Sequence, residues 1–121
     1  MSTSKNQSFV SRLGFACAGF AHGLRAERSV QIQAVAFILV VIAMSVLHVE
    51  PQWWALVFVA SAGVLAAELL NTAIEHLADH LHPQIHPAIR IVKDCAAAGV
   101  LVASAGAVGV AVALAAHLLA R

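Results

Sequence analysis

Three long apolar runs, separated by two short polar breaks, dominate the sequence. They cover approximately residues 30–48, 53–81 and 90–119 of a 121-residue chain. A helix needs about 20 apolar residues to cross a bilayer. The first and third runs meet this length. The second meets it if its polar half, after Ala67, is buried among helices or lies at the interface. We therefore expect an all-α membrane protein with three transmembrane helices, in a single domain over residues 1–121.

The composition supports lipid rather than water as the main solvent. Hydrophobic residues make up 61% of the chain and charged residues only 11%, whereas soluble domains are about 45–50% apolar. A small soluble domain has a high ratio of surface to volume and needs a polar surface. The formal net charge is +1. This balance excludes nucleic acid as a partner, because binding to phosphate backbones requires clustered Lys and Arg.

The breaks between the runs carry helix-start and interface signals. Residues 48–51 form a short turn that ends in Pro51, a residue suited to the first turn of a helix. Trp53 and Trp54 follow at once, as expected for an interfacial aromatic belt. Residues 82–87 contain two prolines and should end the second helix. The sequence therefore predicts helices over 30–48, 53–81 and 90–119.

The basic residues predict the orientation of these helices. Six of the seven precede the first run or lie at the junction of the second and the third: Lys5, Arg12, Arg25, Arg28, Arg90 and Lys93. The turn at 48–52 has none, and Arg121, at the other end of the third run, falls on the same side as that turn. Loops rich in Lys and Arg stay on the cytoplasmic side. We expect the N-terminus and the loop at 80–94 in the cytoplasm.

A further helix is expected before the first crossing, over residues 8–28. Its apolar residues recur at helical spacing and are interrupted by Arg12, His22 and Arg25: Val10, Leu13, Ala16, Cys17, Phe20 and Leu24. This pattern is typical of an amphipathic helix that lies on a membrane surface.

The second run carries a polar stripe. Glu68, Asn71, Glu75 and Asp79 follow one another at i, i+3, i+7 and i+11, which places them within roughly 80° of arc on a helix. A carboxylate at membrane depth costs several kcal/mol unless it is paired, hydrated or bound to metal. Glu68 follows an apolar run, so it is the strongest functional candidate. Asp79, near the helix end, is as readily explained as a solvated residue.

Two further charged sites lie near the ends of the crossings. Glu27 stands just before the first crossing, and Lys93-Asp94 lies at the start of the third. Carboxylates with a lysine suit a magnesium-bound phosphate substrate, because carboxylate oxygens hold the hard cation and lysine neutralises phosphate charge. A proton or ion pathway would use the same residue types. The nucleotide motifs G-x-x-x-x-G-K-[ST] and G-x-G-x-x-G and the hydrolase motif G-x-S-x-G do not occur.

Four histidines cluster at positions 76, 80, 82 and 86. Without H-E-x-x-H or a cysteine partner they are better interpreted as interfacial residues than as a zinc site. In the third run, small residues repeat every four positions, a spacing that lets helices pack closely in lipid: Gly99, Ala103, Ala107, Ala111 and Ala115.

The longest motif is E-L-L-N-T-A-I-E-x-x-x-D at 68–79, followed by H-P at 86–87 and A-x-x-x-x-K-D-x-A-A at 88–97. It resembles the prokaryotic diacylglycerol kinase family of small integral-membrane lipid kinases, which includes undecaprenol kinases. The resemblance covers most of the chain, including G-L-R at 23–25. Two segments depart from the family: 27–33 reads E-R-S-V-Q-I-Q where E-R-N-x-R-I-H is frequent, and 82–87 lacks the usual Tyr before His86.

The resemblance implies a homotrimer in the bacterial cytoplasmic (inner) membrane that transfers the γ-phosphate of MgATP to a lipid hydroxyl. Diacylglycerol and undecaprenol both remain open as the lipid. By position, the resemblance implies that Glu68 is the general base and that Glu27 and Glu75 bind magnesium. It implies nucleotide and phosphate ligands at five further positions: Asn71, Asp79, His86, Lys93 and Asp94. A small oligomeric ion- or proton-conducting protein is the alternative, and a non-catalytic assembly subunit is a third.

Overall fold

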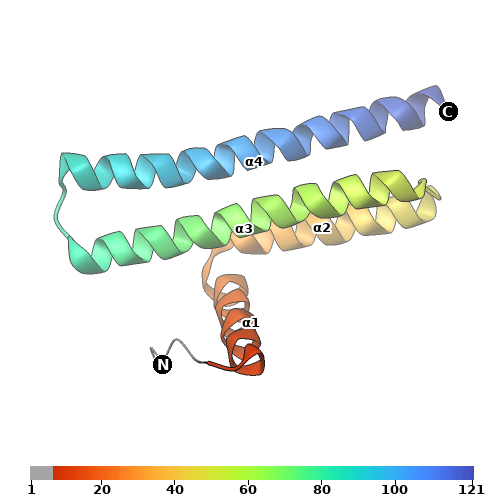
Figure 1. Ribbon diagram of the computed structural model, residues 1–121. Coiled ribbons are helices and arrows are strands. Elements are labelled where there is room, and N and C mark those ends of the chain that lie inside the picture. The colour runs from red at the N-terminus through yellow and green to blue at the C-terminus, as the bar shows by residue number, and fades with distance from the viewer. Residues whose placement is uncertain (1–6) are drawn as a thin grey trace.

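The computed structural model describes residues 7–121, and this part of the chain forms four helices (Figure 1). They are α1 (Phe9–Ala26), α2 (Arg28–Val46), α3 (Pro51–Leu81) and α4 (Pro87–Ala120). The ends of the helices differ from the expected ranges by at most three residues. Lys5, which contributed to the predicted orientation, lies outside the described residues.

Local chemistry explains where the helices begin. The Ser8 hydroxyl accepts a hydrogen bond from the backbone N–H of Ser11 at the start of α1, which satisfies a donor that the first turn leaves unpaired. Both α3 and α4 begin with proline, whose missing N–H costs nothing in a first turn. The expected starts at 53 and 90 were therefore late, because Pro51 and Pro87 are themselves helical.

The turn between α2 and α3 depends on one residue in the left-handed region. His48 has a φ of 50°, a conformation that ends a right-handed helix. The N–H of Val49 then returns to the carbonyl of Met44 at 3.2 Å. The predicted helix end at residue 48 is therefore two residues late, and Val49 is buried against the end of the bundle.

The three long helices run beside one another, and α1 crosses their direction (Figure 1). Helix α3 packs against each of the other three, most extensively against α4. Within residues 7–121, the backbones of α2 and α4 do not approach each other closely. Helix α3 is thus the central element, and a groove remains between α2 and α4.

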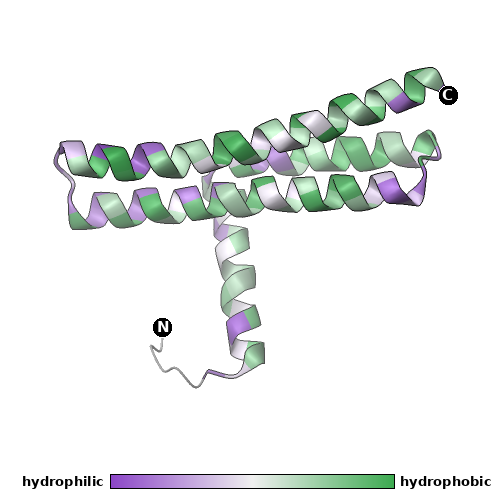
Figure 2. Ribbon diagram, turned by 45° about the horizontal axis from the view of Figure 1, so that its top comes forward, coloured by the Kyte–Doolittle hydropathy of each residue, from purple (hydrophilic) through white to green (hydrophobic). Residues whose placement is uncertain are grey.

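Helices α2, α3 and α4 are each long and apolar enough to cross a membrane. Their outer faces are apolar and exposed, with Leu39, Val59 and Leu101 among the exposed side chains. Figure 2 shows that hydrophobic colour covers most of α2 and α4, while hydrophilic residues gather toward the end that holds the α3–α4 loop. The prediction of an all-helical, multi-pass membrane protein with three spans is confirmed.

The helices differ in length, which separates the two ends of the bundle. Helix α2 has 19 residues and is about 28 Å long, close to the thickness of a hydrocarbon core. Helix α3 has 31 residues and is therefore about 18 Å longer. The additional length of α3, together with the first turns of α4, extends past the start of α2 (Figure 1).

Candidate functional site

Glu68 is the first residue of the polar stripe on α3 and is buried. Only 8% of its surface is exposed, and Thr72, one turn further along α3, is buried to the same degree. A carboxylate is rarely left in such a place without a charged or hydrogen-bonding partner. In the described part of the chain, these two are the buried polar side chains. The sequence analysis argued that Glu68 is not a plainly solvated residue, and its low exposure is consistent with that.

Helix α1 packs against α3 at the residue that follows Glu68. Gly23 is buried, and a Cβ atom at this position would lie 2.8 Å from Cδ2 of Leu69, the residue after Glu68. The absence of a side chain therefore lets α1 pack directly on α3. The sequence analysis noted Gly23 only as part of G-L-R. Nothing in the local sequence indicates which helix the glycine meets.

Glu27 is the single residue between α1 and α2, where it caps both helices. Its Oε1 lies 3.4 Å from Nε2 of His76 on α3. Since His76 follows Glu75 in the sequence, the contact brings Glu27 to the level of α3 where Glu75 lies. The contact partner of Glu27 is His76, a residue that the sequence analysis treated only as interfacial.

Asn71 and Glu75 form a pair along α3. The amide Nδ2 of Asn71 donates to Oε1 of Glu75 at 3.3 Å. The other polar atom of Asn71, Oδ1, is buried and accepts no hydrogen bond. Buried acceptors almost always have a partner, so this oxygen is available to a ligand. Amide and carboxylate oxygens are the ligand types that Mg²⁺ takes.

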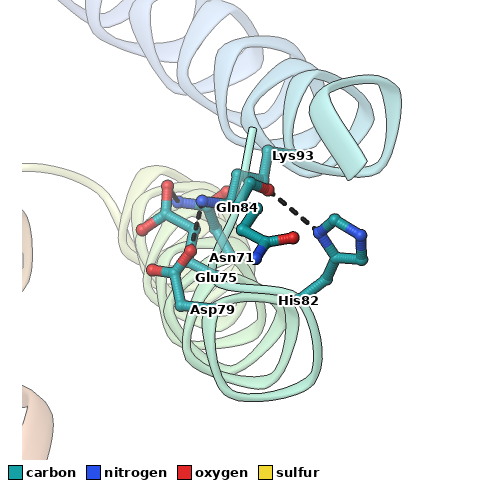
Figure 3. Close-up of polar contacts among 6 residues, drawn as sticks. All are labelled: Asn71, Glu75, Asp79, His82, Gln84 and Lys93. Carbon is teal, nitrogen blue, oxygen red and sulfur yellow. Dashed lines mark hydrogen bonds and ion pairs between the residues drawn. The ribbon is translucent and has the colours of Figure 1, made fainter. Parts of the chain in front are cut away.

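A second group links α3 to α4. Nζ of Lys93 donates to Oδ1 of Asp79 at 2.5 Å, and Figure 3 shows the two side chains pointing toward each other from neighbouring helices. Arg90 and Asp94 form a looser pair at 3.9 Å, one turn apart on α4. The lysine and Asp94 thus lie at the start of α4, where the sequence predicted nucleotide and phosphate ligands.

A cleft of about 240 Å³ lies at the α3–α4 loop. Four of the predicted nucleotide-binding residues line it: Asp79, His86, Lys93 and Asp94. Asn71, Glu68, Glu27 and Glu75 are not among its lining residues. The predicted site therefore falls into two groups. One surrounds buried Glu68 near α1, and the other surrounds the loop cleft.

The carboxylates do not form a cation site by themselves. Within residues 7–121, no group of three or more His, Cys, Asp or Glu side chains is arranged to hold a metal ion. Magnesium bound to nucleotide phosphates needs only one or two protein carboxylates, because phosphate and water oxygens complete its coordination. The oxygens of Glu75, Asn71 and Glu27 fit that requirement.

An apolar groove runs along α3 between α2 and α4, with a volume of about 330 Å³. Its wall includes Phe37, Leu65 and Leu114. Leu65 lies three residues before Glu68, so one end of the groove approaches the buried carboxylate. The small residues Ala107, Ala111 and Ala115 of α4 form part of the same wall, which shows where part of the small-residue stripe points.

The departure at residue 31 has a visible consequence. Nε2 of Gln31 donates to the backbone carbonyl of Leu24 at 3.0 Å, across the junction of α1 and α2. This bond ties the last turn of α1 to the first turns of α2. Gln31 therefore supports the position of Glu27, which lies between the two helices.

Comparison with known proteins covers nearly the whole of this architecture. The family model described as prokaryotic diacylglycerol kinase matches residues 14–115. A diacylglycerol kinase of Synechocystis sp. is 37% identical over 95 residues, which are 78% of this chain and 54% of that protein. An undecaprenol kinase of Bacillus subtilis is 37% identical over 78 residues, which are 64% of this chain and 63% of that protein. The chain thus spans between half and two thirds of the length of these relatives.

Proposed function

The chain belongs to the prokaryotic diacylglycerol kinase family, and we propose that it is a membrane lipid kinase that transfers the γ-phosphate of MgATP to the hydroxyl of a lipid alcohol. The observation that carries the proposal is the burial of Glu68 on α3, between an apolar groove on one side and a polar, lysine-containing end on the other. A lipid kinase has to bring an apolar tail and a charged nucleotide to one point.

Glu68 is the proposed general base. Its carboxylate takes the proton of the lipid hydroxyl while the hydroxyl oxygen attacks the γ-phosphorus, and the bond to the β-phosphate oxygen breaks to release ADP. The ammonium group of Lys93, which contacts Asp79, would neutralise phosphate charge. Glu75, Glu27 and the free oxygen of Asn71 would hold Mg²⁺, which supplies charge neutralisation on the phosphates when bound.

The helix lengths support a membrane placement for this reaction. If α1 lies on the membrane surface, as proposed, its contact at Leu69 supports a position of Glu68 at the interface, where a lipid hydroxyl resides. The extra length of α3 and the start of α4 then project into the aqueous phase with the nucleotide cleft. The basic residues favour the cytoplasmic side of the bacterial inner membrane for this end, with the N-terminus inside.

We propose a homotrimer as the active unit. One subunit is thin, and large apolar side chains are exposed on all three spanning helices. Small residues on α4 let a neighbouring helix approach closely. Mixing Glu68→Gln subunits with Glu27→Gln subunits tests for shared sites. If each site draws these residues from different chains, activity returns in mixed oligomers. Mixed oligomers that stay inactive would show sites built within one chain.

Both lipid alcohols named by the relatives are candidate substrates. The test is phosphate transfer from MgATP by purified protein in detergent micelles that contain diacylglycerol or undecaprenol. We expect transfer to at least one of them. No transfer to either, with protein whose helix content is intact, would overturn the kinase proposal.

Ion conduction is not favoured as the alternative. The first part of α3, residues 51–67, carries no charged side chain. A conducting path would need polar groups through the depth of the bilayer, whereas the charged residues of α3 begin at Glu68.

A further inference from the structure

Two histidines face each other in the loop between α3 and α4. His82 is the C-cap of α3 and His86 is the N-cap of α4. Their ring centroids are 5.3 Å apart, with an angle of 64° between the ring planes. Both line the cleft of about 240 Å³ that also contains Lys93. The two rings therefore offer polar ring nitrogens to whatever occupies the cleft.

Backbone contacts determine which nitrogen of each ring carries hydrogen. Nδ1 of His82 lies 2.9 Å from the carbonyl oxygen of Gln84, which can only accept, so this nitrogen carries the proton. In the neutral ring, Nε2 of His82 is then an acceptor. Nδ1 of His86 accepts from the N–H of Ala88 at 3.1 Å. The proton of His86 is therefore on Nε2, which is a donor.

The position of His82 relative to Lys93 separates two parts of the cleft. Figure 3 shows the His82 ring on the opposite side of Gln84 from the lysine ammonium and Asp79. A nucleotide whose phosphates are bound at the lysine end has its base available to the histidine end. This step rests on the proposed function, which puts MgATP in this part of the molecule.

We propose that His82 is a specificity-determining residue that selects a 6-amino purine. Its Nε2 accepts from the exocyclic amino group, while Nε2–H of His86 donates to the adjacent ring nitrogen. Adenine presents this donor and acceptor side by side on its N6/N7 edge. A 6-oxo purine presents two acceptors there, so its O6 would face the lone pair of His82 and both groups would lose a partner.

The experiment compares ATP with inosine triphosphate, which differs at the 6-position, as phosphate donors for the purified protein. The wild type should have the higher kcat/KM with ATP. His82→Ala should reduce the ratio of the two kcat/KM values by roughly three- to tenfold, the range expected for one hydrogen bond. His82→Lys offers only donors and should shift the ratio further, toward the 6-oxo nucleotide.

The matched control is His80→Lys, which adds the same charge two residues away, at a position that does not line the cleft. Its ratio should equal that of the wild type. A purely structural role for His82 would lower both kcat/KM values equally and leave the ratio unchanged, which would overturn base selection while the kinase proposal stands. No phosphate transfer by the wild type from any nucleotide would overturn both.

Discussion

The two ends of the helical bundle are built in opposite ways. At the turn end, where α2 meets α3, Nε2 of His117 contacts Oε2 of Glu50 at 3.1 Å, and Arg121 donates to the carbonyl of Leu47 at 2.9 Å. Met44 and Leu114 are buried beneath them. At the loop end, α3 and α4 continue without α2, and the side chains of Asp79 and Asp94 are largely exposed.

This difference indicates that the turn end mainly stabilises the bundle and the loop end mainly carries the candidate site. The turn end has buried apolar side chains and ties between α4 and the α2–α3 turn, so it holds the helices together. The loop end leaves a cleft and charged groups accessible, as binding sites on loops usually require. Glu68 lies between the two ends. We expect substitutions near the loop end to reduce activity and substitutions near the turn end to reduce stability.

The largest expected effect is at Glu68. The change Glu68→Gln keeps size and hydrogen bonding but removes basicity, so kcat should fall by roughly 10²–10⁴-fold, the range for a lost general base. Phosphate transfer in micelles is the measurement, with thermal unfolding to show that the fold persists. Wild-type activity in a folded variant would contradict the assignment of Glu68 as general base. It would also weaken the distinction between an end that serves activity and an end that serves stability.

The magnesium requirement should respond next. Glu75→Gln removes a carboxylate charge beside Asn71, and Glu27→Gln removes one beside His76. In each variant the Mg²⁺ concentration for half-maximal activity should rise about tenfold or more, since one lost charged ligand is worth about 1.4 kcal/mol or more. Magnesium titrations at fixed ATP measure this. The variant for comparison is Asp94→Asn, which removes a carboxylate charge in the loop cleft instead. An unchanged magnesium dependence in either glutamate variant would exclude that residue from the cation site.

A moderate effect on stability is expected where α1 meets α3. Gly23→Val inserts a side chain where a Cβ would already lie 2.8 Å from Leu69, and overpacking of this kind costs about 1–3 kcal/mol. Gly14→Val is the matched control, because nothing lies within 4 Å of a Cβ at Gly14. Thermal unfolding and activity should both fall for Gly23→Val relative to Gly14→Val. Equal behaviour of the two variants would show that α1 does not need its close contact with α3.

The smallest effect is at the turn end and depends on pH. The pKa of Glu50 lies below its ordinary value of 4.5, chiefly because its own backbone N–H bonds to the carboxylate, with further contributions from His117 and Arg121. A carboxyl group with a lowered pKa stabilises the fold above its ordinary pKa. This stabilisation is lost as pH falls below about 4.5 and through the lowered value.

Thermal unfolding of the wild type and Glu50→Gln between pH 7 and pH 3 measures this contribution. The stability difference between the two proteins should shrink as pH falls, while phosphate transfer at neutral pH should change little in the variant. A constant difference across this range would show that the Glu50 charge does not stabilise the turn end.

Much of the fold was predictable because local composition is sufficient to identify membrane-spanning helices. Twenty apolar residues and a proline-marked turn are sufficient to place α2, α3 and α4. The position of Glu68 after an apolar run also identified it as more than a solvated residue, although its degree of burial came only from the structure. The contacts between helices were not predictable in the same way. His76 meets Glu27 across 49 positions of sequence, and Gly23 meets Leu69, and no spacing rule connects residues on different helices.

The loop shows the same limit at shorter range. Asp79, His86, Lys93 and Asp94 were identified from a motif, and the structure places them around one cleft. The pairing of Asp79 with Lys93, however, depends on how α4 returns beside α3. The hydrogen positions of His82 and His86 depend on the carbonyl of Gln84 and the N–H of Ala88, which become neighbours only once the loop closes.

The single-residue joint between α1 and α2 has a mechanical consequence. Because only Glu27 separates the two helices, α1 cannot tilt or sink without displacing that carboxylate relative to His76. On the proposed placement of α1, changes in headgroup packing or bilayer curvature would rotate this helix about the junction at Glu27. Changes in the surrounding lipid that move α1 would thereby also move Glu27, the proposed magnesium ligand.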